Sequence, residues 1–313
     1  MILALAGGVG GAKLAQGLAM LRDPDDLTIV VNTGDDFNHL GFNISPDVDT
    51  VMYWLSGLND RVRGWGLADE TWHFMAGLKT LGGPAWFNLG DRDLATHVER
   101  TRLLRSGQSL SEVTAHLCRQ LGIRHRVVPM TDDTVHTVVH TDEGVLPFQD
   151  YFVRRQCEPR VNKLEYTGAA DARPSPAFGD LLTASHIEAI VICPSNPLLS
   201  VEPILSLGGV RRRIENLTVP VVAVSPIVGG QAIKGPAAKI LRELGRDASA
   251  LEIARHYVGL IDGLVIDNVD SPLAPAIEAL GIDVLITATV MKTPNDQKTL
   301  ADETLQFAAR LFR

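Results

Sequence analysis

Short apolar runs alternate with helical patterns at both ends of the chain. Residues 2–6 and 27–31 are predicted strands, and a helix is predicted between them at 12–21. Because the apolar runs are continuous rather than alternating, they are typical of parallel strands that are covered on both faces. The pattern predicts an α/β fold with a Rossmann-like, doubly wound, mostly parallel sheet. Four further strands and a closing helix are predicted in the second half, at 187–193, 219–225, 263–266, 282–287 and from about 297.

The middle of the chain has a different pattern. Two helices are predicted, at 94–104 and 110–121, and a hairpin follows at 135–148, with its turn at Asp142-Glu143-Gly144. This segment therefore resembles an insertion more than a continuation of the sheet. The predicted division is a nucleotide-binding core, residues 1–58 and 178–313, and an inserted α+β subdomain, residues 59–177.

Charge and cysteine content limit the partners of the protein. Among 313 residues, 29 are lysine or arginine and 37 are aspartate or glutamate, which gives a formal net charge of −8. Proteins that coat nucleic acid or anionic membranes need clustered basic charge, so neither partner is expected, and the apolar runs are shorter than a span of about 20 residues. The 3 widely separated cysteines form no disulfide framework, which favours a reduced, cytoplasmic compartment. A homodimer is the default expectation for the assembly.

The glycine-rich segment after the first strand is the first candidate site. Gly8, Val9, Gly10, Gly11 and Lys13 lead directly into a helix. Glycines let the backbone approach a ligand closely, and a helix N-terminus offers free N–H groups to an anion. The segment is not a Walker motif, and Lys13 replaces the third glycine of the dinucleotide fingerprint. It predicts a phosphate or diphosphate site, with a ligand-free turn as the alternative.

Four aspartates follow the second strand closely in the sequence: Asp35, Asp36, Asp47 and Asp49. Magnesium prefers oxygen ligands and takes one or two protein carboxylates, while water and phosphate fill its other positions. The set therefore predicts a magnesium site. The alternative is that Asp47 or Asp49 caps the helix that continues through residues 51–55.

Two later loops add polar groups at the same edge of the predicted sheet. Ser195 and Asn196 follow one strand, and Gly229, Gly230 and Lys234 follow the next. Their side chains and backbone can bind a base, a ribose or a phosphate, although each loop taken alone is also explained by turn chemistry. Because ligands of open α/β sheets bind beyond the carboxyl ends of the strands, four such loops predict a nucleotide site.

The middle segment carries a further polar motif. Asp91 and Arg92 precede a predicted helix that contains His97. A ligand site is one interpretation of this motif. A helix N-cap at Asp93, with Arg92 as its salt-bridge partner, is the other.

Taken in order, these motifs resemble those of the 2-phospho-L-lactate transferase family of coenzyme F420 biosynthesis. The segments that carry the resemblance are GGVGGAK, NTGDD, SPDVDT, LGDRD, PMTDD, FQD, PSNP and SPIVGGQAIKGPA. The chain departs from the family pattern at Ala288-Thr289-Val290-Met291, where an Asp-Thr pair is expected before the methionine.

The resemblance implies a phosphodiester-forming reaction. The ribityl hydroxyl of the deazaflavin Fo (7,8-didemethyl-8-hydroxy-5-deazariboflavin) attacks the phosphorus that bears a lactyl, enolpyruvyl or glyceryl group in a guanosine diphosphate-linked donor. GMP leaves, and F420-0 or its dehydro form is the product. Magnesium is the implied metal, and the identity of the three-carbon acid stays open.

The resemblance also implies roles for the candidate residues. Asp35, Asp47 and Asp49 are assigned to magnesium. Asp36, Asp91, Arg92 and His97 are assigned to Fo, and either Asp35 or Asp91 is the base for the ribityl hydroxyl. The residues assigned to the donor nucleotide are Gly8, Val9, Gly10, Gly11, Lys13, Ser195, Asn196, Gly229, Gly230 and Lys234.

Two other functions are alternatives. The YvcK-like gluconeogenesis factors resemble the same core and act as nucleotide-sugar-binding regulators without transferase activity. An NAD-dependent dehydrogenase would use an acidic residue near the end of the second strand, such as Asp35, but the glycine fingerprint does not match.

Overall fold

Seven parallel strands form the central sheet of the computed structural model, which describes residues 1–183 and 186–311. The strand order is β14-β13-β10-β9-β1-β2-β5. The predicted α/β class is confirmed. The strands are β1 (Ile2–Ala6), β2 (Leu27–Val31), β5 (Arg126–Pro129), β9 (Ala189–Ile192), β10 (Val221–Val224), β13 (Gly263–Asp267) and β14 (Asp283–Thr287).

The direction of chain progression reverses at the centre of this sheet. From β1 the chain continues to β2 and β5 on one side, whereas β9, β10, β13 and β14 extend the sheet on the other side. The connections therefore diverge between β1 and β9. In open α/β sheets this switch point leaves a crevice beyond the carboxyl ends of the strands, and ligands bind there.

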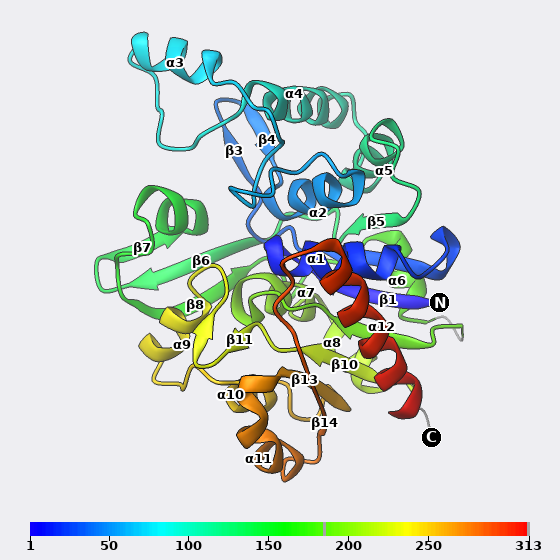
Figure 1. Ribbon diagram of the computed structural model, residues 1–313. Helices are drawn as coiled ribbons and strands as arrows, with labels where there is room; N and C mark the ends of the chain where they lie inside the picture. Colours follow the sequence, from blue (N-terminus) through cyan, green and yellow to red (C-terminus); the bar gives the residue numbers. More distant parts are fainter. Residues whose placement is uncertain (184–185, 312–313) are drawn as a thin grey trace.

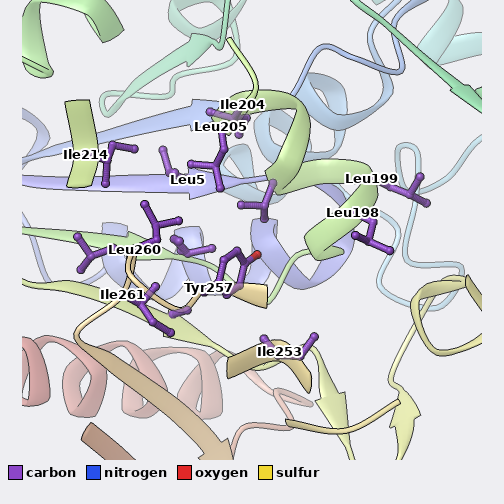
Figure 2. Packing of buried hydrophobic residues seen from close by; sticks show 14 of the residues in the cluster. Leu5, Leu198, Leu199, Ile204, Leu205, Ile214, Ile253, Tyr257, Leu260 and Ile261 are labelled. Atoms are coloured by element: carbon purple, nitrogen blue, oxygen red, sulfur yellow. The ribbon is translucent and has the colours of Figure 1, made fainter. Parts of the chain in front are cut away.

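Helices cover both faces of the sheet. On one face, α1 packs against α2 and α12, and the blue and red helices lie side by side in Figure 1. On the other face, Leu5 of β1 belongs to the same buried hydrophobic cluster as Ile204, Leu205 and Ile253, part of which Figure 2 shows. The helices are α1 (Gly8–Ala19), α2 (Pro46–Ser56), α3 (His73–Thr80), α4 (Asp91–Arg105), α5 (Leu110–Gln120), α6 (Pro176–Leu181), α7 (Glu202–Leu205), α8 (Val210–Glu215), α9 (Ala237–Glu243), α10 (Ala250–His256), α11 (Ala274–Glu278) and α12 (Pro294–Leu311).

Smaller sheets and short helical turns complete the fold. The predicted hairpin is confirmed as two strands of a three-stranded antiparallel sheet with the order β7-β6-β8. The remaining strands are β3 (Phe37–His39), β4 (Phe42–Ile44), β6 (His136–Thr141), β7 (Gly144–Pro147), β8 (Val161–Thr167), β11 (Ile227–Val228) and β12 (Gln231–Ala232). The short turns are η1 (Pro24–Asp26), η2 (Asp150–Arg154), η3 (Pro197–Val201) and η4 (Asn268–Leu273).

Two local predictions differ from the structure. The first helix begins at Gly8 rather than at residue 12, because the glycine segment is itself the first turn. The sequence pattern also placed residues 59–177 outside the sheet, but β5 pairs with β2 in parallel and is an edge strand of it. A four-residue strand that ends in proline gives too short a pattern to identify. The division of the chain into two domains stays a prediction.

Helices long and apolar enough to cross a bilayer are absent from the part of the chain that the structure describes.

Candidate functional site

A cavity of about 580 Å³ lies beyond the carboxyl ends of the central strands. Its lining includes residues of the loops that follow β1, β2, β9 and β10, which the sequence analysis placed at one edge of the sheet. The loop after β14 contributes Thr289, Val290 and Met291. The cavity is therefore at the switch point between β1 and β9.

The glycine segment brings the N-terminus of α1 to this cavity. Gly7, the N-cap residue, has no capping side chain, and Gly8 has a φ of +62°, which favours glycine. A Cβ atom on Gly10 would lie 2.2 Å from the carbonyl oxygen of Pro194, so this helix end approaches the β9 loop through the absence of a side chain. Gly8, Val9 and Gly10 line the cavity. The free N–H groups and the positive end of the helix dipole favour an anion at this position.

Two buried carboxylates stand beside this helix end. The side-chain amide of Asn32 donates to Asp35 Oδ1 and to Asp47 Oδ2, at 3.0 Å in each case. Gly8 N donates to Asp47 Oδ1 at 2.7 Å, so Asp47 also touches the glycine segment. The sequence analysis did not single out Asn32, although its place directly after β2 in the NTGDD segment is a usable signal.

The electrostatics of this pair favour a cation. Burial raises the pKa of Asp35 well above the ordinary aspartate value, and the neighbouring Asp47 and Asp36 raise it further. Burial also raises the pKa of Asp47, against the hydrogen bonds from Asn32 and Gly8 that lower it. A divalent cation between the two carboxylates would offset this repulsion, and their oxygens are ligands that magnesium accepts.

The other two aspartates of the predicted set have different surroundings. Asp49 lines the cavity, but Arg100 engages both of its carboxylate oxygens, one of them from Nη1 at 3.1 Å. Asp36 accepts a hydrogen bond from the Ser45 hydroxyl at 2.7 Å and is not part of the cavity lining. The N-cap of α2 is Ser45, so neither Asp47 nor Asp49 is the N-cap residue.

Two lysines give this end of the cavity a local positive charge despite the negative net charge of the chain. Lys13 Nζ donates to the carbonyl oxygen of Met291 at 2.7 Å and lies 5.6 Å from the ring centre of Trp54. Burial and the nearby Lys234 lower the pKa of Lys13. Lys234 Nζ donates to the carbonyl oxygen of Arg63 at 3.2 Å. Both ammonium groups belong to side chains that line the cavity.

The remaining donor-site candidates divide into two groups. Ser195 and Asn196 line the cavity, where Ser195 Oγ accepts from Gly7 N and Asn196 Oδ1 caps η3. Three glycines are not in the lining. Gly229 and Gly230 have φ values of +56° and +76° and turn the β11–β12 hairpin. A Cβ on Gly11 would lie 2.4 Å from Ser195 Oγ, so Gly11 is needed for packing.

The LGDRD segment also divides between structural and cavity-facing residues. Asp91 accepts hydrogen bonds from Thr71 Oγ1 at 2.5 Å, His73 N at 2.9 Å and Phe74 N at 3.0 Å, and so holds the start of α3. Arg92 donates to the carbonyl oxygen of Ala68, and neither Asp91 nor Arg92 lines the cavity. This geometry favours Asp35 over Asp91 as the base.

Asp93 and His97, by contrast, do line the cavity. The N-cap of α4 is Gly90, so the interpretation of Asp93 as the N-cap is wrong. Tyr53, from α2, donates its hydroxyl to Asp93 Oδ1 at 2.5 Å. The sequence analysis did not assign Asp93 to the site, although its spacing of four residues from His97, which places both on one face of a helix, is a usable signal.

Aromatic side chains also line the cavity. Trp65, Phe87, Phe148 and Phe152 all contribute to it. The rings of Phe148 and Phe152 are stacked, with centres 5.3 Å apart and planes inclined by 14°. Surfaces of this kind suit a flat conjugated ring. The cavity therefore combines an anion-binding helix end, a carboxylate pair and an aromatic surface.

Comparisons with known proteins show related sequences. The family model described as "2-phospho-L-lactate transferase CofD" matches residues 2–281. The chain is 40% identical to a phosphoenolpyruvate transferase of Streptomyces griseus, and the match covers 98% of each chain. It is 37% identical to a 2-phospho-L-lactate transferase of Methanosarcina mazei, over 97% of this chain and 99% of the relative.

A solved structure supports the fold alone. A crystal structure of a UPF0052 family member from Bacillus halodurans superposes with a TM-score of 0.63 at 15% sequence identity. The superposition covers 97% of this chain and 98% of that chain.

Proposed function

The chain belongs to the 2-phospho-L-lactate transferase (CofD) family, whose members are transferases of coenzyme F420 biosynthesis, and on this premise we propose its substrates. The donor is a phospho-acid linked to guanosine diphosphate, and the acceptor is the ribityl hydroxyl of Fo. The products are F420-0, or its dehydro form, and GMP. The observation that carries this proposal is the Asn32-bridged pair of Asp35 and Asp47 beside the N-terminus of α1, in a cavity that also has an aromatic surface.

The donor diphosphate would bind at the glycine segment. The free N–H groups at the start of α1 and the ammonium groups of Lys13 and Lys234 supply hydrogen-bond donors and positive charge. Ser195 and Asn196 lie across the same end of the cavity and would complete the nucleotide site. Phosphoryl-type transfer depends on such positioning and charge neutralisation more than on covalent help from the protein.

Asp35 and Asp47 would hold a magnesium ion. The two carboxylates fit this role because Asn32 orients both of them, and a bound cation would offset the burial and the neighbouring negative charge that raise the pKa of Asp35. When bound, the ion would neutralise negative charge on the phosphate oxygens. Asp49 is a weaker candidate ligand, since Arg100 already balances its charge.

The deazaflavin ring of the acceptor would lie against aromatic side chains of the cavity. Phe87, Phe148 and Phe152 provide apolar surface for the deazaflavin ring and exclude water from it. The ribityl chain would then extend toward the carboxylate pair. Asp35 would accept the proton of the attacking hydroxyl, whose oxygen forms the new bond to phosphorus as the bond to the GMP oxygen breaks.

Mass spectrometry of reaction products tests the proposal. The protein is incubated with Fo, magnesium and each donor in turn: the lactyl, enolpyruvyl and glyceryl forms. We expect GMP and one F420-0-type product. The preferred donor identifies the three-carbon acid, which the similarity to both a phosphoenolpyruvate transferase and a 2-phospho-L-lactate transferase leaves open. Asp35→Asn should abolish product formation.

The test also separates the alternatives. Absence of product with all three donors would contradict the proposal. Binding of a nucleotide sugar by a protein that ignores Fo would instead support the regulator hypothesis. The cytoplasmic location and the homodimer expected from the sequence stay predictions.

A further inference from the structure

Five polar side chains from α2 and α4 form a buried network at one wall of the cavity. Arg100, which has no exposed surface, is paired with Asp49, and Asp49 Oδ2 lies 3.6 Å from His97 Nδ1. His97 Nε2 lies 3.3 Å from Asp93 Oδ2, and Asp93 Oδ1 accepts the hydroxyl of Tyr53. Every member except Arg100 lines the cavity.

The position of Arg100 determines the tautomer of His97. Arg100 Nη1 lies 3.3 Å from His97 Nδ1, and a guanidinium group can only donate. Nδ1 is therefore the acceptor in this contact, and Nε2 is the ring nitrogen that carries a hydrogen. His97 is 2% exposed, and its Nε2 has no hydrogen-bond partner among residues 1–183 and 186–311. A buried N–H donor thus lies at the cavity wall, 3.3 Å from Asp93 Oδ2 but not aligned with that oxygen for a hydrogen bond.

Asp93 supplies an acceptor beside this donor. Burial alone would raise the pKa of Asp93, but the neighbouring His97, Tyr53 and Arg100 together bring it below the ordinary aspartate value. The group is therefore a carboxylate at neutral pH, with Oδ1 occupied by Tyr53 and Oδ2 next to His97 Nε2.

An N–H donor and a carboxylate acceptor 3.3 Å apart match the chemistry of a hydroxyl group, which accepts and donates at once. A metal ion would satisfy the carboxylate but not the N–H group, and the guanidinium of Arg100 next to His97 disfavours a second cation. An anionic ligand would satisfy the N–H group but would be repelled by Asp93. A neutral polyol fits both.

We propose that Asp93 and His97 bind an inner hydroxyl of the acceptor's polyol chain and so select acceptors that carry one. This inference rests on the proposed function, because it assigns part of the acceptor site. Asp93 and His97 recognise the part of the polyol chain between the aromatic ring and the reacting terminal hydroxyl. Tyr53 and Arg100 act through Asp93 and His97 and are positioning residues.

Equilibrium binding of two ligands tests the proposal. One is Fo, and the other is an analogue with the same ring and terminal hydroxyl but without the inner hydroxyls of the chain. Dissociation constants are measured by quenching of deazaflavin fluorescence with GDP and magnesium present. The unmodified protein should bind Fo about 10- to 100-fold more tightly than the analogue, as expected for hydrogen bonds to a charged group.

Three variants sharpen the comparison. In Asp93→Asn the Tyr53 hydroxyl orients the amide, so a donor replaces the acceptor at Oδ2, and the preference for Fo should fall to about threefold or less. His97→Gln should also reduce the preference for Fo, and it replaces Asp93→Asn as the test variant if Asp93→Asn does not fold. Glu99→Gln is the matched control, since Glu99 lies on the same helix, pairs with Arg102 and is outside the cavity lining. Its preference should be unchanged.

The outcomes are distinct. Full preference for Fo in Asp93→Asn, or in His97→Gln if only that variant folds, would overturn the proposal. So would the loss of one bound Mn²⁺ per chain in Asp93→Asn, because the group would then be a metal site. A protein that binds Fo with this preference but yields no product would refute the proposed function and leave this inference intact, whereas failure to bind Fo would refute both.

Discussion

Replacing Arg100 by methionine should destabilise the fold strongly. Arg100 has no exposed surface and binds both carboxylate oxygens of Asp49, which is itself 5% exposed. Methionine keeps much of the side-chain length but removes the charge, so Asp49 becomes a buried carboxylate without a cation. Breaking a buried pair in this way typically costs about 3–5 kcal/mol, and we expect a loss of unfolding free energy in that range.

The double variant Asp49→Asn/Arg100→Met measures how much of this loss arises from the unpaired charge. Once the Asp49 carboxylate is removed as well, much of the loss of unfolding free energy should disappear. The coupling energy between positions 49 and 100 should therefore be about 2 kcal/mol or more. Urea denaturation followed by tryptophan fluorescence gives the unfolding free energies of the unmodified protein, of Arg100→Met, of Asp49→Asn and of the double variant. A single variant that loses less than about 1 kcal/mol, or strictly additive losses, would show that water reaches the pair and would refute the reasoning.

Three further predictions concern the donor end of the cavity. The raised pKa of Asp35 means that, without metal, the folded protein keeps a proton on this carboxyl at pH values where the unfolded chain has released it. The free energy of unfolding in EDTA should therefore fall as the pH rises from about 4 toward the pKa of Asp35 in the folded protein. Asp35→Asn should flatten this dependence in pH-resolved urea titrations, and an unchanged slope would exclude Asp35 as its source. Lys13→Met should weaken GDP binding about tenfold in isothermal titration, and equal affinity would remove Lys13 from the donor site. Gly10→Ala places a methyl group against the Pro194 carbonyl and should cost about 1–3 kcal/mol, whereas an unshifted denaturation midpoint would show that the loop adjusts freely.

Local patterns were sufficient to predict the sheet and the edge at which the cavity forms. Continuous apolar runs identify parallel strands, and the carboxyl ends of such strands have a fixed direction, so loops after several strands must share one edge. The short strand β5 was missed because Arg126–Pro129 has no neighbours in sequence that indicate its pairing with β2.

The roles of individual acids were harder to predict because they depend on distant partners. Asp49 is 51 residues from Arg100 in the chain, and nothing near Asp49 in the sequence shows that its charge is already balanced. Asp91 and Asp93 are two residues apart on α4, and therefore point in different directions from the helix. The sequence motif identified the segment, but only the hydrogen bonds of Asp91 with the start of α3 and of Asp93 with Tyr53 of α2 show which carboxylate lines the cavity.

The hydrogen bond from Lys13 to the Met291 carbonyl joins parts of the chain that are 278 residues apart. During synthesis the glycine segment leaves the ribosome before the loop after β14, so the hydrogen bond that orients Lys13 cannot form until that loop has been made. A nascent chain that lacks this loop therefore lacks the hydrogen bond that orients Lys13. Proteolytic cleavage near residue 290 would likewise loosen a contact at the opposite end of the polypeptide.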